Sequence, residues 1–233
     1  MTNAASSPAT QLRQAVEAYS ISAGDDVVTD FQTASKLVTA WLDYFVNSVS
    51  KGTCDDIILA CRAALIEAAG CLSLGLVRPA IFAIRLQYEL FLAWPYFNDH
   101  TVEWKSWQEG RSEFPLRAEN VKYLKKHSPR MEVRLAILQK NSDYSQEDPY
   151  SVLSKVVHGS SYETMPDFEH FAAISMGQLE IDRCIELQTQ SSQYLSDVAA
   201  SWLTDRWHDI PVLVKQELAQ RLPAPALVEF CRA

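Results

Sequence analysis

Two long apolar stretches stand next to each other near the middle of the 233-residue chain, Ile57–Val77 and Pro79–Phe97. Each is long enough to cross a membrane, but each also carries two internal charges. One charged residue in mid-membrane costs about 2.5–3.5 kcal/mol, so four of them favour a different structure. We predict a buried, antiparallel helical hairpin and no membrane span. The four charged residues are Arg62, Glu67, Arg85 and Glu89.

The composition narrows the fold class and the chemistry. Seven glycines are few for an all-β protein, which needs many tight turns, so helices are favoured. The net charge of −8 disfavours broad binding of nucleic acid by charge. Five cysteines without C-x-x-C spacing and five scattered histidines suggest neither a disulfide framework nor a metal site. We expect a cytoplasmic protein without a cofactor, and the polar start, Met1–Ser7, does not resemble a signal peptide.

Periodicity and capping residues predict one all-α domain over residues 1–233, an up-and-down helical bundle around the central hairpin. Ser7-Pro8 opens a first helix that Gly24 is expected to stop, and a second begins at Thr29 or Asp30. The first stretch of the hairpin is slender and apolar nearly all round, which is typical of the centre of a bundle. Further helices are expected over residues 98–113, 116–127, 128–140, 149–158, 171–204 and 210–222, with a disordered start at 1–7 and an extended tail at 223–233.

The charged residues of the hairpin form the first candidate site. Arg85 and Glu89 are four residues apart and share a helix face, with Arg78 near the same face. Counting from the turn, Glu67 lies about as far down the first helix as Arg85 and Glu89 lie down the second. The group is either a buried ion-pair lock or a polar pocket that binds or acts on a ligand.

The second candidate is His158, where a helix ends and Gly159 supplies a left-handed cap. The helix dipole alone favours a histidine there. Alternatively, Ser154, one turn earlier on the same face, and His158 could do acid–base chemistry with Glu163 as an orienting group. Lys155 of the same helix joins Glu67, Arg78 and Arg85 as a candidate ligand-binding residue.

A locally basic stretch from Arg111 to Arg134 is the third candidate. It is either a solvated helix face or a patch for phosphate, RNA or an acidic partner. Trp104, Trp107 and Tyr123 lie in or near it and could stack on bases.

Two segments resemble the HEPN-like proteins. The sequence RPAIFAIRLQYELFLAWPYF (Arg78–Phe97) is similar to their central helix, and YSVLSKVVHGSSYE (Tyr150–Glu163) to a later helix that ends in a Ser…His-Gly element. The resemblance covers residues 55–163. The resemblance implies an all-α up-and-down bundle, often a homodimer. It also implies a role as a ribonuclease, or as the partner of one, in toxin–antitoxin, CRISPR and phage-defence settings.

The chain departs from the HEPN nuclease signature, an arginine four to six residues before a histidine. Ser151, Val152 and Leu153 stand where that arginine would precede His158. The leading hypothesis is therefore a non-catalytic HEPN-like protein that binds a partner or a small ligand in bacterial defence. One alternative is a ribonuclease with a displaced site of His158, Arg85, Glu89 and Ser154. The other is a nucleotide or small-ligand sensor that uses Glu67, Arg78, Arg85 and Lys155.

Overall fold

The computed structural model describes residues 7–50, 52–128, 130–142, 144, 147–160 and 164–233, and this part of the chain contains helices and no strand. The prediction of an all-α protein is confirmed; the expected disorder of residues 1–7 lies almost wholly outside the described residues. The helices are α1 (Pro8–Ala34), α2 (Lys36–Tyr44), α3 (Asp55–Ser73), α4 (Val77–Asp99), α5 (Thr101–Gln108), α6 (Arg117–His127), α7 (Met131–Gln139), α8 (Pro149–His158), α9 (Gln178–Leu203), α10 (Val212–Arg221) and α11 (Ala224–Arg232).

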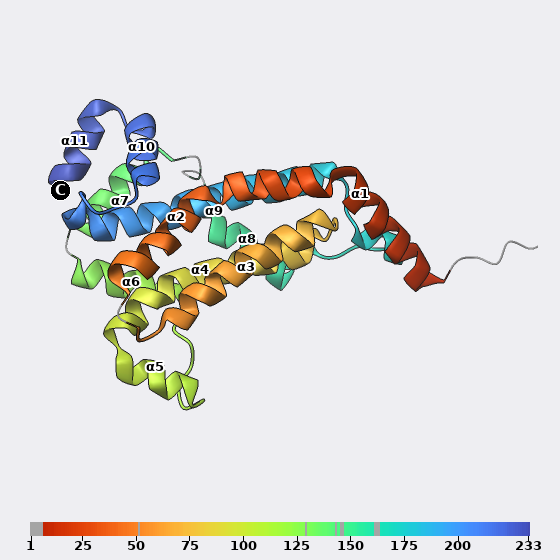
Figure 1. Ribbon diagram of the computed structural model, residues 1–233, viewed down its shortest axis with the longest axis horizontal. Helices are drawn as coiled ribbons and strands as arrows, with labels where there is room; N and C mark the ends of the chain where they lie inside the picture. Colours follow the sequence, from red (N-terminus) through yellow and green to blue (C-terminus); the bar gives the residue numbers. More distant parts are fainter. Residues whose placement is uncertain (1–6, 51, 129, 143, 145–146, 161–163) are drawn as a thin grey trace, which may run out of the picture.

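The predicted hairpin is present, and α3 and α4 lie side by side (Figure 1). Gly75, in the turn between them, has φ +76°, a conformation that L side chains rarely adopt. Within the described residues, no helix combines the length and the apolar character that crossing a bilayer requires.

Three expected boundaries are wrong. Helix α1 continues through Gly24, which does not stop it but lets the helix approach α3, because a Cβ there would lie 3.2 Å from the Ser73 carbonyl oxygen. The long helix expected over 171–204 begins only at Gln178, after a short 3₁₀ turn at Phe171–Ile174. The tail is not extended: α11 buries Phe230.

The centre of the molecule is α9, which packs against α1, α2, α4, α7 and α8. Around it gather large buried aromatic side chains, among them Trp41, Phe45 and Trp94, the last two stacked with centroids 4.6 Å apart. The slender helix α3 was expected at this position but lies at the side of the bundle. It packs against α1, α2, α4 and the π-helical turn Phe45–Val49, and its remaining face is open.

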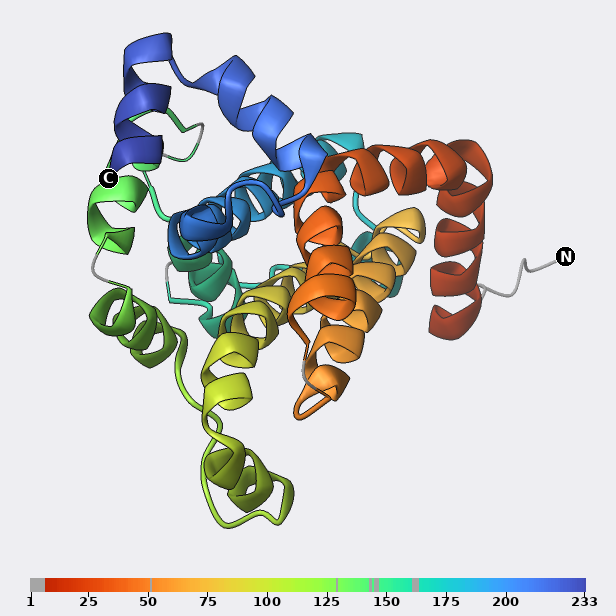
Figure 2. The same ribbon diagram turned by 60° about the vertical axis from the view of Figure 1, so that its left-hand side comes forward.

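The molecule is elongated. Helices α10 and α11 stand at one end together with α7, and α1 runs to the other end (Figure 1). The short helix α5 projects sideways from the end of α4, as Figure 2 also shows. The hairpin therefore has α5 standing at one of its ends.

Candidate functional site

Arg85 and Glu89 lie on α4 where it packs against α8, and they form an ion pair of 3.0 Å. Their third partner is Tyr150, in the first turn of α8. Arg85 donates to the tyrosine hydroxyl oxygen (3.1 Å), and that hydroxyl donates to Glu89 (3.3 Å). Both charged side chains are half-buried, and the guanidinium lies 5.3 Å from the centre of the Tyr150 ring. The group joins two helices.

Glu67 does not belong to this group. It is exposed on α3, and no ion pair in the described part of the chain involves it. Counting residues from the turn correctly gives the position of Glu67 along the hairpin. It does not give the side to which Glu67 points, because Glu67 points to the open face of α3 while Arg85 points to α8. The predicted lock of Glu67, Arg85 and Glu89 is therefore wrong in one of its three members.

Arg78 makes two hydrogen bonds to backbone carbonyl groups. It donates to Val156 (3.0 Å), in the last turn of α8, and to Thr164 (2.9 Å), where the chain continues toward α9. The last carbonyl groups of a helix lack partners within the helix, so a guanidinium there is favourable. Arg78 thus fastens α8 and the following segment to α4, and its two terminal nitrogens are engaged.

The predicted residues on α8 do not converge with Arg85. His158 ends the helix and is exposed, and Gly159 has the predicted left-handed conformation with φ 55°. Eight residues separate His158 from Tyr150, the Arg85 partner, which is about 12 Å along a helix. Lys155 is exposed and paired with Glu147.

Ser154 is placed between these two groups, one turn after Tyr150. Its hydroxyl oxygen is buried and has no hydrogen-bond partner among the described residues. Glu163, the expected orienting group of His158, lies outside the described residues. In the described part of the chain, therefore, no acid–base pair assembles around His158.

A cluster around Arg117 was not anticipated as a site. Arg117 donates to Asp148 and to the Tyr194 hydroxyl oxygen, both at 2.6 Å, and its guanidinium carbon lies 4.7 Å from the Tyr150 ring centre. Burial lowers the pKa of Arg117, but Tyr194 and Asp148 outweigh it and the net direction is upward. Burial raises the pKa of Tyr194. Through these contacts the Arg117 side chain joins α6 to α8 and α9. We interpret the cluster as structural.

The basic stretch from Arg111 to Arg134 is therefore not one exposed face. Arg134 is buried and pairs with Asp205 at 2.8 Å, and Arg117 is half-buried among Asp148, Tyr194 and Tyr150. Trp104 is buried against Phe97, with ring centroids 5.2 Å apart. The expectation that the whole stretch is a solvated face or an RNA patch is wrong for the two arginines, and Trp104 is not free to stack on a base.

A second buried polar group lies where α9 meets α10. Asp197, fully buried, accepts hydrogen bonds from the Tyr144 hydroxyl (2.5 Å) and from Arg221 (3.1 Å through Nη1). Burial raises the pKa of Asp197 to about 6 against the opposing effect of Arg221. The sequence signal was present, because Asp197 is the single charged residue between Gln188 and Ser201, which is typical of a buried helix.

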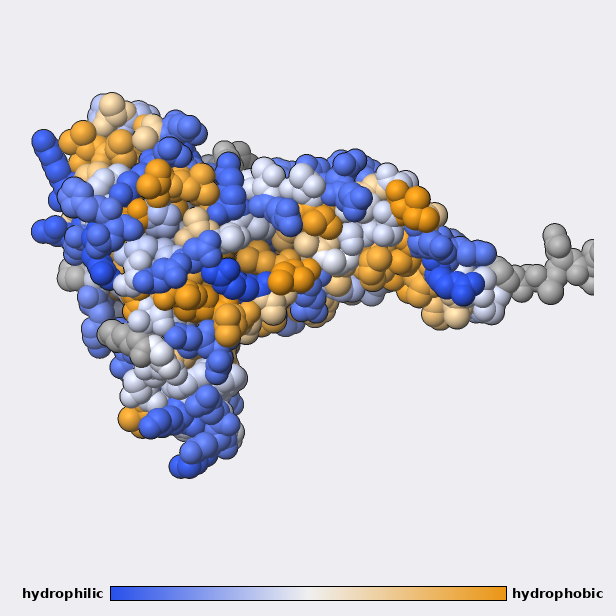
Figure 3. Space-filling view, viewed as in Figure 1, coloured by the Kyte–Doolittle hydropathy of each residue, from blue (hydrophilic) through white to orange (hydrophobic). Residues whose placement is uncertain are grey.

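The outer face of the hairpin is the largest unexplained feature. Ile66 is 74% exposed, Leu59 is 59% exposed and Phe82 is 48% exposed, with Ala63 and Gly70 exposed between them. Figure 3 shows hydrophobic surface along the hairpin. Near α5 the face is hollowed into a groove of about 480 Å³. The apolar residues that line the groove are Ile57, Ala60, Leu86, Leu90, Trp104, Trp107 and Phe114.

Metal and thiol chemistry receive no positive support from the described residues. They contain no group of three histidine, cysteine or acidic side chains that could hold a metal ion. Burial raises the pKa of Cys54, Cys61 and Cys184 to about 12, which keeps these thiols protonated and poorly nucleophilic.

Comparisons of the chain with protein-family models, with curated proteins and with solved structures found no match. Function is therefore inferred from the geometry of this chain.

Proposed function

We propose that the protein is a non-catalytic helical binding protein that works as a homodimer, with the open face of the α3–α4 hairpin as its interface. The observation that carries the proposal is the exposure of Leu59, Ile66 and Phe82 on the most apolar helix pair of the chain. Scattered exposed apolar residues are ordinary, but a contiguous apolar face is typical of an interaction surface.

The sequence of α3 is apolar on nearly all sides, which supports burial of most of its surface. A helix that is apolar all round is expected in an interior, yet in one chain α3 is covered on only part of its surface. Apolar surface gains about 25 cal/mol for each Å² removed from water. A partner on this face would give α3 the surroundings that its sequence predicts.

A second copy of the chain suits this face. The face is mainly apolar and carries few charges, the exposed carboxylates Glu67 and Asp56 among them, so it offers little charge pattern to select an unlike partner. It carries a ridge of exposed apolar side chains, which includes Ile66 and Phe82, and a groove beside α5. In a two-fold dimer the ridge of each copy can enter the groove of the other, as an isologous interface requires.

The size of the open face also fits a dimer interface. The 19 residues of α3 extend about 28 Å, and two packed helices give the face a width of about 20 Å. The projections of α5 and of the ridge add area to this footprint. The total is on the scale of the ~800 Å² that each partner contributes to a standard interface.

The HEPN-like relationship, with a role in bacterial anti-phage defence or a toxin–antitoxin pair, is part of this proposal. Its support is that the two resembling segments, α4 and α8, are packed against each other through Arg85, Glu89 and Tyr150. A ribonuclease that uses His158 and Arg85, and a sensor that uses Glu67 and Arg85, are not favoured by the geometry. Arg85 is engaged with Glu89 and Tyr150, and neither His158 nor Glu67 reaches that group.

Matched charge substitutions test the proposal. Ile66→Glu places a carboxylate in the proposed interface, and Val212→Glu makes the same change on α10, at a position that is 65% exposed. Both sites are exposed, so both variants keep the fold. Burying two unpaired carboxylates should weaken dimerisation at least about a hundredfold, or ~2.7 kcal/mol, in Ile66→Glu alone. Light scattering after size exclusion measures this, and equal masses for both variants and the unaltered chain would contradict the interface.

A further inference from the structure

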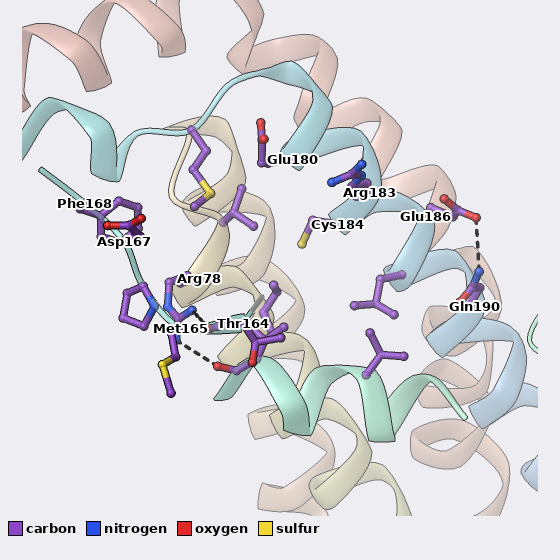
Figure 4. Close-up of a pocket in the computed structure, with 17 residues that line it drawn as sticks. Arg78, Thr164, Met165, Asp167, Phe168, Glu180, Arg183, Cys184, Glu186 and Gln190 are labelled. Atoms are coloured by element: carbon purple, nitrogen blue, oxygen red, sulfur yellow. Dashed lines mark hydrogen bonds between the residues drawn. The ribbon is translucent and has the colours of Figure 1, made fainter. Parts of the chain in front are cut away.

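A second concave surface lies away from the open face of the hairpin, where α4, α8 and the first half of α9 meet (Figure 4). It is a cleft of about 580 Å³, within the usual range of ligand pockets. Helices α8 and α9 form its walls, the start of α4 forms its floor, and the segment 164–168 borders one end. It does not involve the Arg85 group or the hairpin groove.

The interior of the cleft is apolar. Val77 and Ile81 come from α4, Val152 and Val156 from α8, and Leu187 from α9. At the mouth, Met165 is 56% exposed and Phe168 is 37% exposed. Flexible methionine and aromatic side chains at the edge of an apolar groove are adaptable contacts for a partner.

Hydrogen bonds fix both ends of residues 164–176, the stretch of chain that includes the bordering segment. At one end Arg78 donates to the Thr164 carbonyl oxygen at 2.9 Å. At the other end the Met176 amide donates to the Gly75 carbonyl oxygen at 2.8 Å, and the Ser175 hydroxyl bonds to the Leu74 carbonyl oxygen at 3.3 Å. A preformed cleft avoids much of the ordering cost of binding.

The charges at the rim are mainly acidic. Asp167, Glu180 and Glu186 line the cleft, against Arg78 and Arg183. Arg78 is occupied by backbone carbonyl groups, and Arg183 lies three residues from each glutamate on α9, so the two glutamates exceed the one nearby arginine and Asp167 adds a further negative charge. The chain as a whole carries a net charge of −8. An apolar trough with an acidic edge is complementary to an apolar ridge with basic flanks.

We infer that this cleft docks an amphipathic α-helix with an apolar ridge and lysine or arginine on its flanks. A helix laid between α8 and α9 over α4 would place its i, i+3, i+4 and i+7 side chains in the trough. Its basic side chains would then meet Asp167, Glu180 and Glu186. The site is separate from the dimer face and does not depend on the proposed function.

The test uses a synthetic peptide of leucine and lysine, about 14 residues or four helical turns long, with all leucines on one face. A second peptide replaces each lysine by glutamate, and a third scrambles the order. Fluorescence anisotropy measures binding to the full chain. We expect binding of the first peptide and not of the other two, since the acidic peptide is repelled and the scrambled one has no ridge.

Variants locate the binding. The double variant Asp167→Lys with Glu186→Lys should weaken binding of the basic peptide about tenfold. Glu17→Lys with Glu229→Lys makes the same change in net charge at exposed positions elsewhere and should stay within about twofold. Val152→Trp fills the cleft and should abolish binding. Absence of binding by the basic peptide, equal effects of the two charge pairs, or full binding by Val152→Trp would each overturn the inference.

Discussion

Replacing Arg221 by methionine should cost much of the stability of the fold. The guanidinium and the Asp197 carboxylate form an ion pair whose side chains are 10% and 0% exposed. Methionine keeps most of the apolar stem but leaves Asp197 with the Tyr144 hydroxyl as its remaining hydrogen-bond donor among the bonds described above. A buried charge that loses its partner costs about 3–5 kcal/mol, a large part of the ~5–15 kcal/mol that holds a domain together.

The cost should depend on pH in a defined direction. Burial raises the pKa of Asp197 to about 6 in the folded chain, above its value near 4 when unfolded. The folded state therefore keeps a proton that the unfolded state releases, and the contribution of this group to stability falls as pH rises from about 4 to 6. Loss of Arg221 raises this pKa further, so the penalty of Arg221→Met is smaller at pH 5 than at pH 8.

Urea unfolding followed by circular dichroism measures the free energy of unfolding at both pH values. Arg221 also contacts Glu217, so Glu217→Gln serves as the control and should cost less than about 1 kcal/mol. The double variant Arg221→Met with Asp197→Leu should recover most of the loss, because a buried pair can be replaced by apolar residues at little cost. A single variant within about 0.5 kcal/mol of the unaltered chain at pH 8, or no recovery in the double variant, would refute the reasoning.

Two other predictions concern the turn of the hairpin and the absence of catalysis. Gly75→Ala should lower the free energy of unfolding by about 1–3 kcal/mol, because φ is +76° and the new Cβ would clash with the Ser175 hydroxyl oxygen. Gly70→Ala, in a helix with open space around it, should raise the free energy of unfolding by up to about 1 kcal/mol. Thermal melting compares the two variants. Purified protein should leave total RNA intact on a gel, and cleavage that disappears in both His158→Ala and Arg85→Met would restore the ribonuclease alternative.

Local sequence patterns predicted the hairpin and α8 well. The hairpin follows from two apolar stretches around a short turn, and α8 from its caps. Asp148 accepts a hydrogen bond from the Tyr150 amide at 3.1 Å, and Gly159 adopts the left-handed conformation. In both cases the residues that decide the structure are neighbours in the chain.

The errors arose where tertiary contacts decide. Gly24 has the pattern of a helix stop, but its role is close packing on α3. Arg117 sits among other basic residues, and nothing near it in sequence indicates that Asp148 and Tyr194 will surround it. The direction of Glu67, toward the open face and away from Arg85, depends on the rotation of α3 about its axis, which residue spacing does not determine.

The mass of the unaltered protein in solution tests the central claim most directly. Sedimentation velocity over a dilution series should show a species of twice the 26.3 kDa chain at micromolar concentration, dissociating on dilution. The proposal would be contradicted by a single species of chain mass at every concentration, since the open face of α3 and α4 would then stay in contact with water.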